Sequence, residues 1–353
     1  METLRGVGII GCGDGGMSNY HGLVAAGIRT VAFYDNHEKV RNVLEFEGWR
    51  GVRICKAEAE LLAHPDVDVV VIATPDGEHL APARRVLEAG KYVFIEKPLA
   101  TSSMDIAAFR DLIRRYPKKM LFSEKYSFAY PVQAALGEWE RERLGQFLTG
   151  STSYMMTNCD RIMGDGKWRT ESAYNPVAGG LSHNFMTALL FARARITRVW
   201  AVGQVLAYPE LKKYGGYDTM HGVLEFDTGR QLMWSVCLAV TGQHGMYAHR
   251  TVAHALQFEN GSLVYGPDSS GDRLVVSGLN LRFQREPDYG GDWSSYNAYL
   301  YKRMWLDILA SLDNSQSLHT IEQGLNVAYA CHAAYQSARR DGRWMMVNET
   351  ELL

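Results

Sequence analysis

The sequence of 353 residues lacks the features that mark several specialised classes of protein. Lysine and arginine (37) balance aspartate and glutamate (39) without blocks of like charge, so we expect neither nucleic acid nor a membrane surface as a partner. No apolar run reaches the roughly 18 residues that a membrane span needs. The N-terminus lacks the charged and apolar regions of a signal peptide. The length favours a globular protein of about two domains.

Cysteine is scarce, and its spacing is irregular. The five cysteines lie at positions 12, 55, 159, 237 and 331, and no C-x-x-C pair occurs. The odd number and wide spacing indicate neither a disulfide framework nor a zinc site, and we expect reduced thiols in a cytoplasmic protein. His244, His249 and His254 are five residues apart, which suits neither one helix face nor one metal cluster. We predict no metal site.

Two hydrophobic patterns divide the chain near residue 123. Before this point, unbroken apolar runs occupy residues 6–10, 30–35, 67–75, 91–98 and 119–126, which is typical of buried parallel strands. Segments with helical spacing separate these runs, and one of them begins at a Ser102–Asp105 capping pattern. The alternation predicts a doubly wound α/β domain of the Rossmann type over residues 1–123.

A different pattern follows. Polar and apolar residues alternate over residues 146–157, 221–242 and 254–266, and turn residues occur at 227–229 and 260–261. We expect a further strand at residues 199–205. Helical spacing over 299–312, and from a Thr320–Gln323 cap to about residue 340, predicts two final helices. We expect residues 124–353 to form an α+β domain with a mostly antiparallel open sheet and with loops near 155–180 and 267–295. Its last helix can pack back on the first domain.

The segment GCGDGG (11–16) follows the first strand directly and contains G-x-G-x-x-G. The motif alone is a weak signal, but its place between a strand and a helix is the one that dinucleotide binding requires. Gly11 permits the tight turn, Gly13 gives a pyrophosphate access to the backbone, and Gly16 allows close packing. The helix N-terminus supplies N–H groups to phosphates. Asp14 adds a negative charge that must point outward or be offset.

Asp35 ends the second strand about 20 residues after the last glycine, where a carboxylate binds the ribose 2′-hydroxyl. A carboxylate there would repel the 2′-phosphate of NADP, so we predict NAD. The alternative is a glycine-rich turn in a fold that binds no nucleotide.

Glu96, Lys97 and Pro98 end the fourth of these runs, at the sheet edge where ligands of open α/β sheets bind. A lysine there could transfer protons with a pKa lowered by desolvation and nearby cations, or it could hold a substrate hydroxyl. Pro98 can follow a cis peptide bond in a tight turn that directs Lys97 into the cleft. The alternative is a solvated lysine at the start of a loop.

These motifs together resemble the Gfo/Idh/MocA oxidoreductase family in order and spacing. The similar segments are G-x-G-x-x-G, LLAHPDVDVVVIATPDGEH (61–79), AGKYVFIEKPLA (89–100) and SEKYSFAYP (123–131), and the resemblance weakens beyond residue 131. It implies a Rossmann domain followed by an α+β domain whose open sheet often forms a dimer or tetramer interface. It also implies NAD-dependent hydride transfer at a carbinol carbon of a sugar, glycoside, inositol or related polyol.

By this resemblance Lys97 is the catalytic lysine, Glu96 lies near the cofactor, and Thr74, Pro75 and His79 line the cofactor cleft. Four other residues are weaker candidates for binding the substrate: Lys125, Tyr126, Trp168 and Arg169. Tyr126 could equally serve packing, and Arg169 a surface ion pair.

A second family motif, of the type GG-x-x-x-D-x-x-x-H, is incomplete in AGGLSHNFMTALL (178–190). Aligned on the glycines, Asn184 takes the Asp position, as a substrate-binding candidate, and Ala188 takes the His position. Aligned on the imidazole, His183 takes the His position and Gly179 the Asp position. The second register leaves a more normal length before the next strand, so we predict that His183 is an acid–base residue. A core or cap role for His183 is the alternative.

Neither register supplies the usual carboxylate, which keeps two other functions open. One is a redox-neutral enzyme of the glycosidase, epimerase or eliminase type with tightly bound NAD. The other is a non-catalytic regulator that binds a dinucleotide, against which the intact EKP argues.

Overall fold

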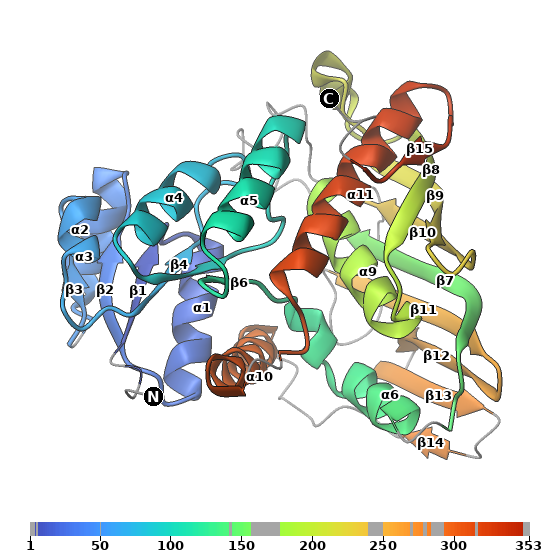
Figure 1. Cartoon of the computed structure of the whole chain (residues 1–353), viewed down its shortest axis with the longest axis horizontal. Coiled ribbons are helices and arrows are strands. Elements are labelled where there is room, and N and C mark those ends of the chain that lie inside the picture. The colour runs from blue at the N-terminus through green and yellow to red at the C-terminus, as the bar shows by residue number, and fades with distance from the viewer. Residues whose placement is uncertain are drawn as a thin grey trace. The chain divides into compact units, whose positions relative to one another are not determined.

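A computed structural model describes residues 4, 6–49, 51–140, 143–156, 177–238, 250–268, 271–277, 281–283, 293–314 and 317–348 (Figure 1). The chain divides into two compact units. The first comprises residues 1–100, 104–125 and 294–325, and the second comprises residues 101–103, 126–293 and 326–353. None of the described helices is long and apolar enough to cross a membrane.

The first unit is built on a six-stranded parallel sheet in the order β3-β2-β1-β4-β5-β6. Its strands are β1 (Val7–Ile10), β2 (Thr30–Tyr34), β3 (Arg53–Ile54), β4 (Val69–Ile72), β5 (Tyr92–Ile95) and β6 (Met120–Leu121). Every residue of β1 and β4 is buried, as their unbroken apolar runs predict. The strand order reverses between β1 and β4, and this reversal creates the crevice where such folds bind ligands. The predicted doubly wound fold is confirmed.

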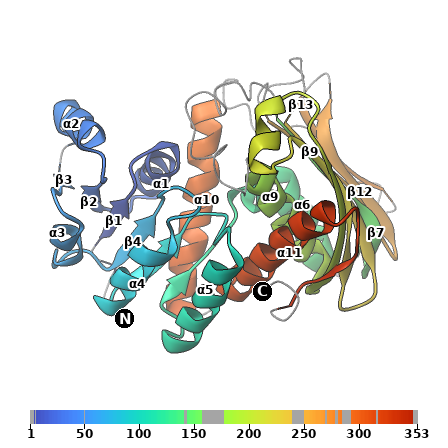
Figure 2. The same ribbon diagram turned by 90° about the horizontal axis from the view of Figure 1, so that it is seen from above.

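Helices cover both faces of this sheet. The connecting helices are α1 (Asp14–Ala25), α2 (Glu38–Glu47), α3 (Glu58–Leu62), α4 (Leu80–Glu88) and α5 (Ser103–Arg115). Figure 2 shows α1 and α2 on one face and α4 and α5 on the other, as right-handed crossovers require.

A helix from late in the chain, α10 (Trp293–Asn314), also packs within the first unit. Trp305 is fully buried, and its ring centroid lies 5.0 Å from that of Phe94 on β5. Gly22 on α1 allows close approach, because a Cβ there would collide with Tyr301. The sequence placed this helix with residues 124–353, whereas the structure groups residues 294–325 with the first unit. The aromatic residues of α10 pack on α1 and β5. Helical spacing in the sequence predicts the helix but not the elements against which it packs.

The second unit contains a nine-stranded sheet in the order β14-β13-β12-β11-β7-β10-β9-β8-β15. Its strands are β7 (Phe147–Met156), β8 (Ile196–Gln204), β9 (Thr219–Phe226), β10 (Gln231–Cys237), β11 (Arg250–Phe258), β12 (Gly261–Asp268), β13 (Gly271–Ser277), β14 (Leu281–Phe283) and β15 (Met345–Met346). Strand β10 pairs with β7 in parallel, and the other neighbouring pairs are antiparallel. The predicted mostly antiparallel sheet is confirmed, and both predicted turns join neighbouring strands.

One prediction for this unit is wrong. Residues 267–295 were expected to form a loop, yet they include β13 and β14 and the start of α10. The apolar run of β13, Leu274–Val276, is only three residues long, which is too short to predict a strand. Strand β13 forms because it pairs with β12 over seven residues. Residues 157–176, most of the other expected loop, lie outside the described residues.

Helices α6 (Tyr130–Glu140), α9 (Val177–Ala192) and α11 (Ile321–Arg339) line one face of the nine-stranded sheet (Figure 2). Two 3₁₀ helices, η1 (Lys125–Phe128) and η2 (Pro209–Tyr214), lie in connections. Helix α11 begins with the predicted capping box: Gln323 N–H donates to Thr320 Oγ1 (3.2 Å), and Thr320 N–H donates to Gln323 Oε1 (3.0 Å). The boundary between the two units falls within α11.

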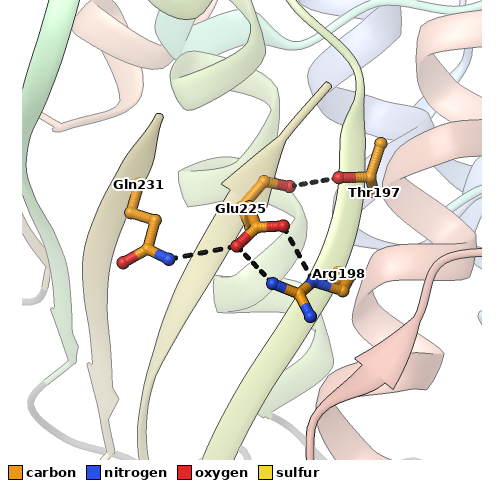
Figure 3. Close-up of polar contacts among 4 residues, drawn as sticks. All are labelled: Thr197, Arg198, Glu225 and Gln231. Atoms are coloured by element: carbon orange, nitrogen blue, oxygen red, sulfur yellow. Dashed lines mark hydrogen bonds and ion pairs between the residues drawn. The ribbon is translucent and has the colours of Figure 1, made fainter. Parts of the chain in front are cut away.

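A polar cluster joins three strands of the sheet around Glu225 on β9 (Figure 3). Arg198 on β8 donates two hydrogen bonds to the Glu225 carboxylate, of 2.7 and 2.6 Å, and Gln231 on β10 donates a third of 3.1 Å. The Arg198 guanidinium holds the pKa of Glu225 below its usual value. Thr197 Oγ1 donates to the Glu225 carbonyl (3.1 Å), so the cluster reinforces the register of β8 on β9.

Candidate active site

The glycine loop joins β1 to α1. Gly11 has φ +88°, and a Cβ there would lie 2.6 Å from the Ala73 carbonyl, so both conformation and space require glycine. A Cβ on Gly16 would overlap the Gly11 carbonyl oxygen, whereas one on Gly13 would meet no described atom within 4 Å. Among the described residues, no side chain caps the N-terminus of α1, and Asp14 is exposed. The first N–H groups of α1 therefore suit an anion.

Asp35 follows β2 and lies beside this loop. Its Oδ2 accepts the Cys12 N–H (2.8 Å), and its Oδ1 accepts the His37 N–H (2.9 Å). Because a carboxylate has about four lone-pair sites, each oxygen can still accept a hydroxyl. Burial, reinforced by the Asp35 charge, raises the pKa of the Cys12 thiol well above its usual range, so this thiol stays protonated.

The residues after β4 and β5 lie at adjacent strand ends. Ile72 at the end of β4 pairs with Ile95 at the end of β5, and the Glu96 N–H donates to the Ile72 carbonyl (3.0 Å). The two strands therefore end side by side. Thr74 and Pro75 come after β4, and Glu96 and Lys97 come after β5. The Lys97–Pro98 peptide bond is cis, in agreement with the sequence. The Lys97 side chain is half-buried, and among the described residues its Nζ has no hydrogen-bond or ion-pair partner.

His79 connects these two strand ends. Its side chain is only 2% exposed; Nδ1 lies 3.0 Å from the Pro98 carbonyl, and Nε2 lies 3.0 Å from the Thr74 carbonyl. Both ring nitrogens face carbonyl oxygens, and an N–H on either nitrogen donates to the carbonyl beside it. His79 thus holds the peptide next to Lys97 against the loop after β4.

Two side chains that the sequence did not predict as site residues, Asn19 and Tyr301, hold the Glu96 carboxylate. Oε1 accepts from Asn19 Nδ2 (2.7 Å) on α1 and from Tyr301 Oη (2.9 Å) on α10, while Oε2 accepts the Lys97 N–H (3.2 Å). Lys125, predicted to bind the substrate, donates to Asn297 Oδ1 (2.6 Å) and lies over the Tyr301 ring. Tyr301 belongs to the aromatic-rich segment of residues 289–305.

The other predicted residues belong to the second unit. His183 on α9 is 2% exposed; its ring lies edge-on to Tyr126 (4.6 Å between centroids) and stacks on Tyr154 (5.5 Å). Asn184 is buried and donates to the Ser235 carbonyl (3.2 Å). Trp168 and Arg169 lie outside the described residues.

The second unit also buries a polar pair that the sequence analysis did not predict. Thr152 Oγ1 lies 2.8 Å from Nδ1 of His254 and 3.4 Å from Oδ1 of Asn184. Burial lowers the pKa of His254 to about 4, so this imidazole is neutral at physiological pH.

The sheet order and the glycine loop are those of a Rossmann domain. In the described part of the chain, the Lys97 amine at the adjacent strand end has no partner. Residues 5–123 match the GFO_IDH_MocA family, described as an oxidoreductase family with an NAD-binding Rossmann fold. This match confirms the resemblance found in the sequence motifs of the same part of the chain.

Two curated relatives and one solved structure illustrate the similarity. A 1-carboxy-3-chloro-3,4-dihydroxycyclohexa-1,5-diene dehydrogenase from Comamonas testosteroni is 24% identical over 249 residues, which are 67% of this chain and 58% of the relative. A glycosyl hydrolase family 109 protein from Shewanella sp. (strain W3-18-1) is 26% identical over 187 residues, which are 48% of this chain and 40% of the relative. The chain thus spans about half the length of these relatives.

The structural similarity extends over nearly the whole chain. A levoglucosan dehydrogenase, solved in complex with NADH and L-sorbose, superposes with a TM-score of 0.79 at 18% identity and covers 97% of this chain and 98% of that one. At this identity the superposition establishes the fold of both units.

Proposed function

We propose that the protein is an NAD(H)-dependent oxidoreductase that transfers hydride to or from a carbinol carbon of a sugar, glycoside, inositol or related polyol. The observation that carries this proposal is the Lys97 amine, which has no partner among the described residues and follows β5 at the ligand-binding edge of a Rossmann sheet. The match of residues 5–123 to an NAD-binding oxidoreductase family supports it.

The residues of the first unit fit a nicotinamide dinucleotide. The open space over Gly13 and the uncapped N-terminus of α1 suit its phosphates, and Asp35 suits a ribose diol. We propose NAD rather than NADP because the Asp35 carboxylate would repel a 2′-phosphate. Glu96, Thr74 and Pro75 would contact the nicotinamide half.

Lys97 would handle the hydroxyl proton. The bound nicotinamide supplies the hydride acceptor or donor. In oxidation, the carbinol C–H electron pair leaves as hydride, the hydroxyl proton passes to the neutral Lys97 amine, and the C–O bond becomes a carbonyl. In reduction, the Lys97 ammonium returns this proton to the carbonyl oxygen.

His183 is proposed as a second acid–base residue, with Tyr126, Asn184, Trp168, Arg169 and Lys125 as substrate-binding candidates. The two tyrosine rings around His183 suit a packing role equally well. A His183→Asn variant separates the roles: loss of kcat at unchanged Tm supports proton transfer, and loss of Tm supports packing.

A redox-neutral NAD-dependent reaction is the second candidate. Similarity to a glycosyl hydrolase family 109 protein and the missing carboxylate of the second family motif favour it. In such a reaction the hydride returns to the substrate, so the cofactor stays bound and no net NADH forms.

The test is to mix the protein with NAD or NADH and a panel of pyranosides, inositols and keto-sugars. The nicotinamide absorbance of each mixture measures the reaction. Lys97→Met removes the amine, and Lys56→Met, at an exposed lysine of the same unit, is its matched control. Net NADH formation by wild type and Lys56→Met but not by Lys97→Met supports the dehydrogenase. Product formation without net NADH supports the redox-neutral enzyme. Cofactor binding without any reaction favours a non-catalytic regulator.

We further propose a cytoplasmic homo-oligomer, a dimer or tetramer. Cys12, Cys55, Cys237 and Cys331 are free thiols, which suits a reducing compartment, and the oligomer follows from the family resemblance. Cell fractionation tests the location, and size-exclusion chromatography with light scattering tests the mass.

A further inference from the structure

A buried asparagine connects the glycine loop to the strand end that carries Lys97. Asn19 on α1 is fully buried, and its Nδ2 donates both to the Gly15 carbonyl (2.9 Å) and to Glu96 Oε1 (2.7 Å). Its Oδ1 accepts from Trp305 Nε1 (3.0 Å). Aspartate lacks the two donors and glutamine is longer, so asparagine suits these contacts best.

The two oxygens of the Glu96 carboxylate have different environments. Oε1 accepts two side-chain donors, Asn19 Nδ2 and Tyr301 Oη. Oε2 accepts only the Lys97 N–H, at 3.2 Å, among the described residues. The two side-chain donors fix the carboxylate at Oε1 and leave capacity at Oε2 for a ligand hydroxyl.

Tyr301 is itself held in place by its neighbours. Lys125 Nζ lies 4.8 Å from the centre of its ring and donates to Asn297 Oδ1 (2.6 Å). Asn297 Nδ2 donates in turn to Ser18 Oγ on α1 (2.9 Å). Helix α10 therefore contacts α1 and the β5 end through a continuous set of polar contacts within one unit.

We propose that Asn19 and Tyr301 are positioning residues for the cofactor. They hold Glu96 Oε1 so that Oε2 binds a cofactor hydroxyl, and they keep the Lys97 strand end in register with the glycine loop. This inference rests on the proposed function, because it concerns the same NAD site. It assigns α10, from the far end of the chain, a role in binding the dinucleotide.

A double-mutant cycle on NADH affinity tests this, with Kd measured by nicotinamide fluorescence and no substrate present. We expect Tyr301→Phe to weaken binding about fivefold and Glu96→Gln about tenfold, since a hydrogen bond to a charged group is lost. The double variant should bind no more weakly than Glu96→Gln, because both changes act through one carboxylate. Tyr329→Phe is the matched control, since this buried hydroxyl has no partner among the described residues.

An Asn19→Asp variant supplies a second readout. It replaces a donor with an oxygen 2.7 Å from Glu96 Oε1, so two carboxylates share the position. We expect weaker NADH binding at neutral pH that recovers as the pH falls and one carboxyl takes a proton. A purely structural role predicts that the Tm falls and recovers in parallel with the affinity, because the same pair of carboxylates would then destabilise the fold.

The outcomes separate this inference from the proposed function. Wild-type affinity in Tyr301→Phe, or effects that multiply in the double variant, would overturn it even if sugars transfer hydride. Non-additive effects on Kd uphold it even if no sugar or polyol reacts, in which case only the proposed function fails.

Discussion

The Cys12 N–H donates a 2.8 Å hydrogen bond to Oδ2 of Asp35, which joins the glycine loop to the end of β2. The residue proposed to bind the ribose is therefore also a structural anchor of the phosphate-binding loop. A substitution at Asp35 should change both cofactor preference and loop order.

Asp35→Asn tests this double role. One oxygen becomes an NH₂ group that faces the N–H of Cys12 or of His37, so one hydrogen bond is lost and the charge is removed. We expect NADH affinity to fall about tenfold and the ratio of NADPH to NADH affinity to rise. Fluorescence titration with both cofactors measures the change. An unchanged ratio would contradict the assignment of Asp35, and Asp66→Asn, in an exposed ion pair, serves as the control.

Two glycines of the same loop should respond differently to alanine. A Cβ on Gly13 meets no described atom, so Gly13→Ala should keep its Tm but lose NADH affinity, because the methyl group occupies the space proposed for the phosphates. A Cβ on Gly16 overlaps the Gly11 carbonyl, so Gly16→Ala should lower the Tm itself. Thermal unfolding with and without NADH distinguishes the two. Equal NADH affinity in Gly13→Ala and wild type would place the phosphates elsewhere.

His79→Ala should loosen both strand ends. The variant leaves the Thr74 and Pro98 carbonyls without their buried partner, at a cost of about 1–3 kcal/mol in the free energy of unfolding. Because Pro98 follows Lys97, kcat should fall as well. Urea unfolding and steady-state kinetics measure the two effects. A stability equal to that of wild type would mean that these contacts contribute nothing.

Burial of His254 predicts a pH dependence of stability. Its pKa falls from an ordinary value of 6.5 to about 4 in the folded state, so the unfolded chain binds the proton more readily. This histidine contributes stability that is present above pH 6.5 and is lost as the pH falls towards 4, on the order of 3 kcal/mol. His319 in the first unit has a pKa of about 4 for the same main reason and should add to the effect.

A His254→Gln variant measures how much His254 contributes to the pH dependence of the free energy of unfolding. Its loss of stability between pH 6.5 and pH 4 should be smaller than that of wild type, and His221→Gln, at an exposed histidine on β9, should behave as wild type. Unfolding curves across this pH range provide the comparison. Equal pH slopes in wild type and His254→Gln would show that His254 is not the group responsible.

The sequence predicted the first unit well because its strands are continuous apolar runs that end at recognisable motifs. Gly11, Asp35 and Lys97 each lie at a strand end, and the parallel sheet brings these ends to one edge. The positions of these residues can be predicted from the local sequence pattern and from one rule, namely that parallel strands end at the same edge of a sheet.

The parts that could not be predicted depend on long-range packing. Asn19 contacts Trp305, 286 positions away, and nothing in either local sequence indicates the pair. Strand β14, with three residues, exists because β13 is beside it. Lys125 fits a substrate-binding motif, yet the structure occupies its amine with Asn297, a partner that the motif does not identify.

The most direct test of the central claim is a single-turnover measurement of enzyme-bound nicotinamide. Wild type, Lys97→Met and Lys56→Met are loaded with NAD and mixed with the panel of sugars and polyols. We predict that bound NADH forms in wild type and Lys56→Met and forms at least about 100-fold more slowly in Lys97→Met, with equal NAD affinity in all three. Formation at the same rate in Lys97→Met, or NAD binding with no redox change in any protein, would contradict the account.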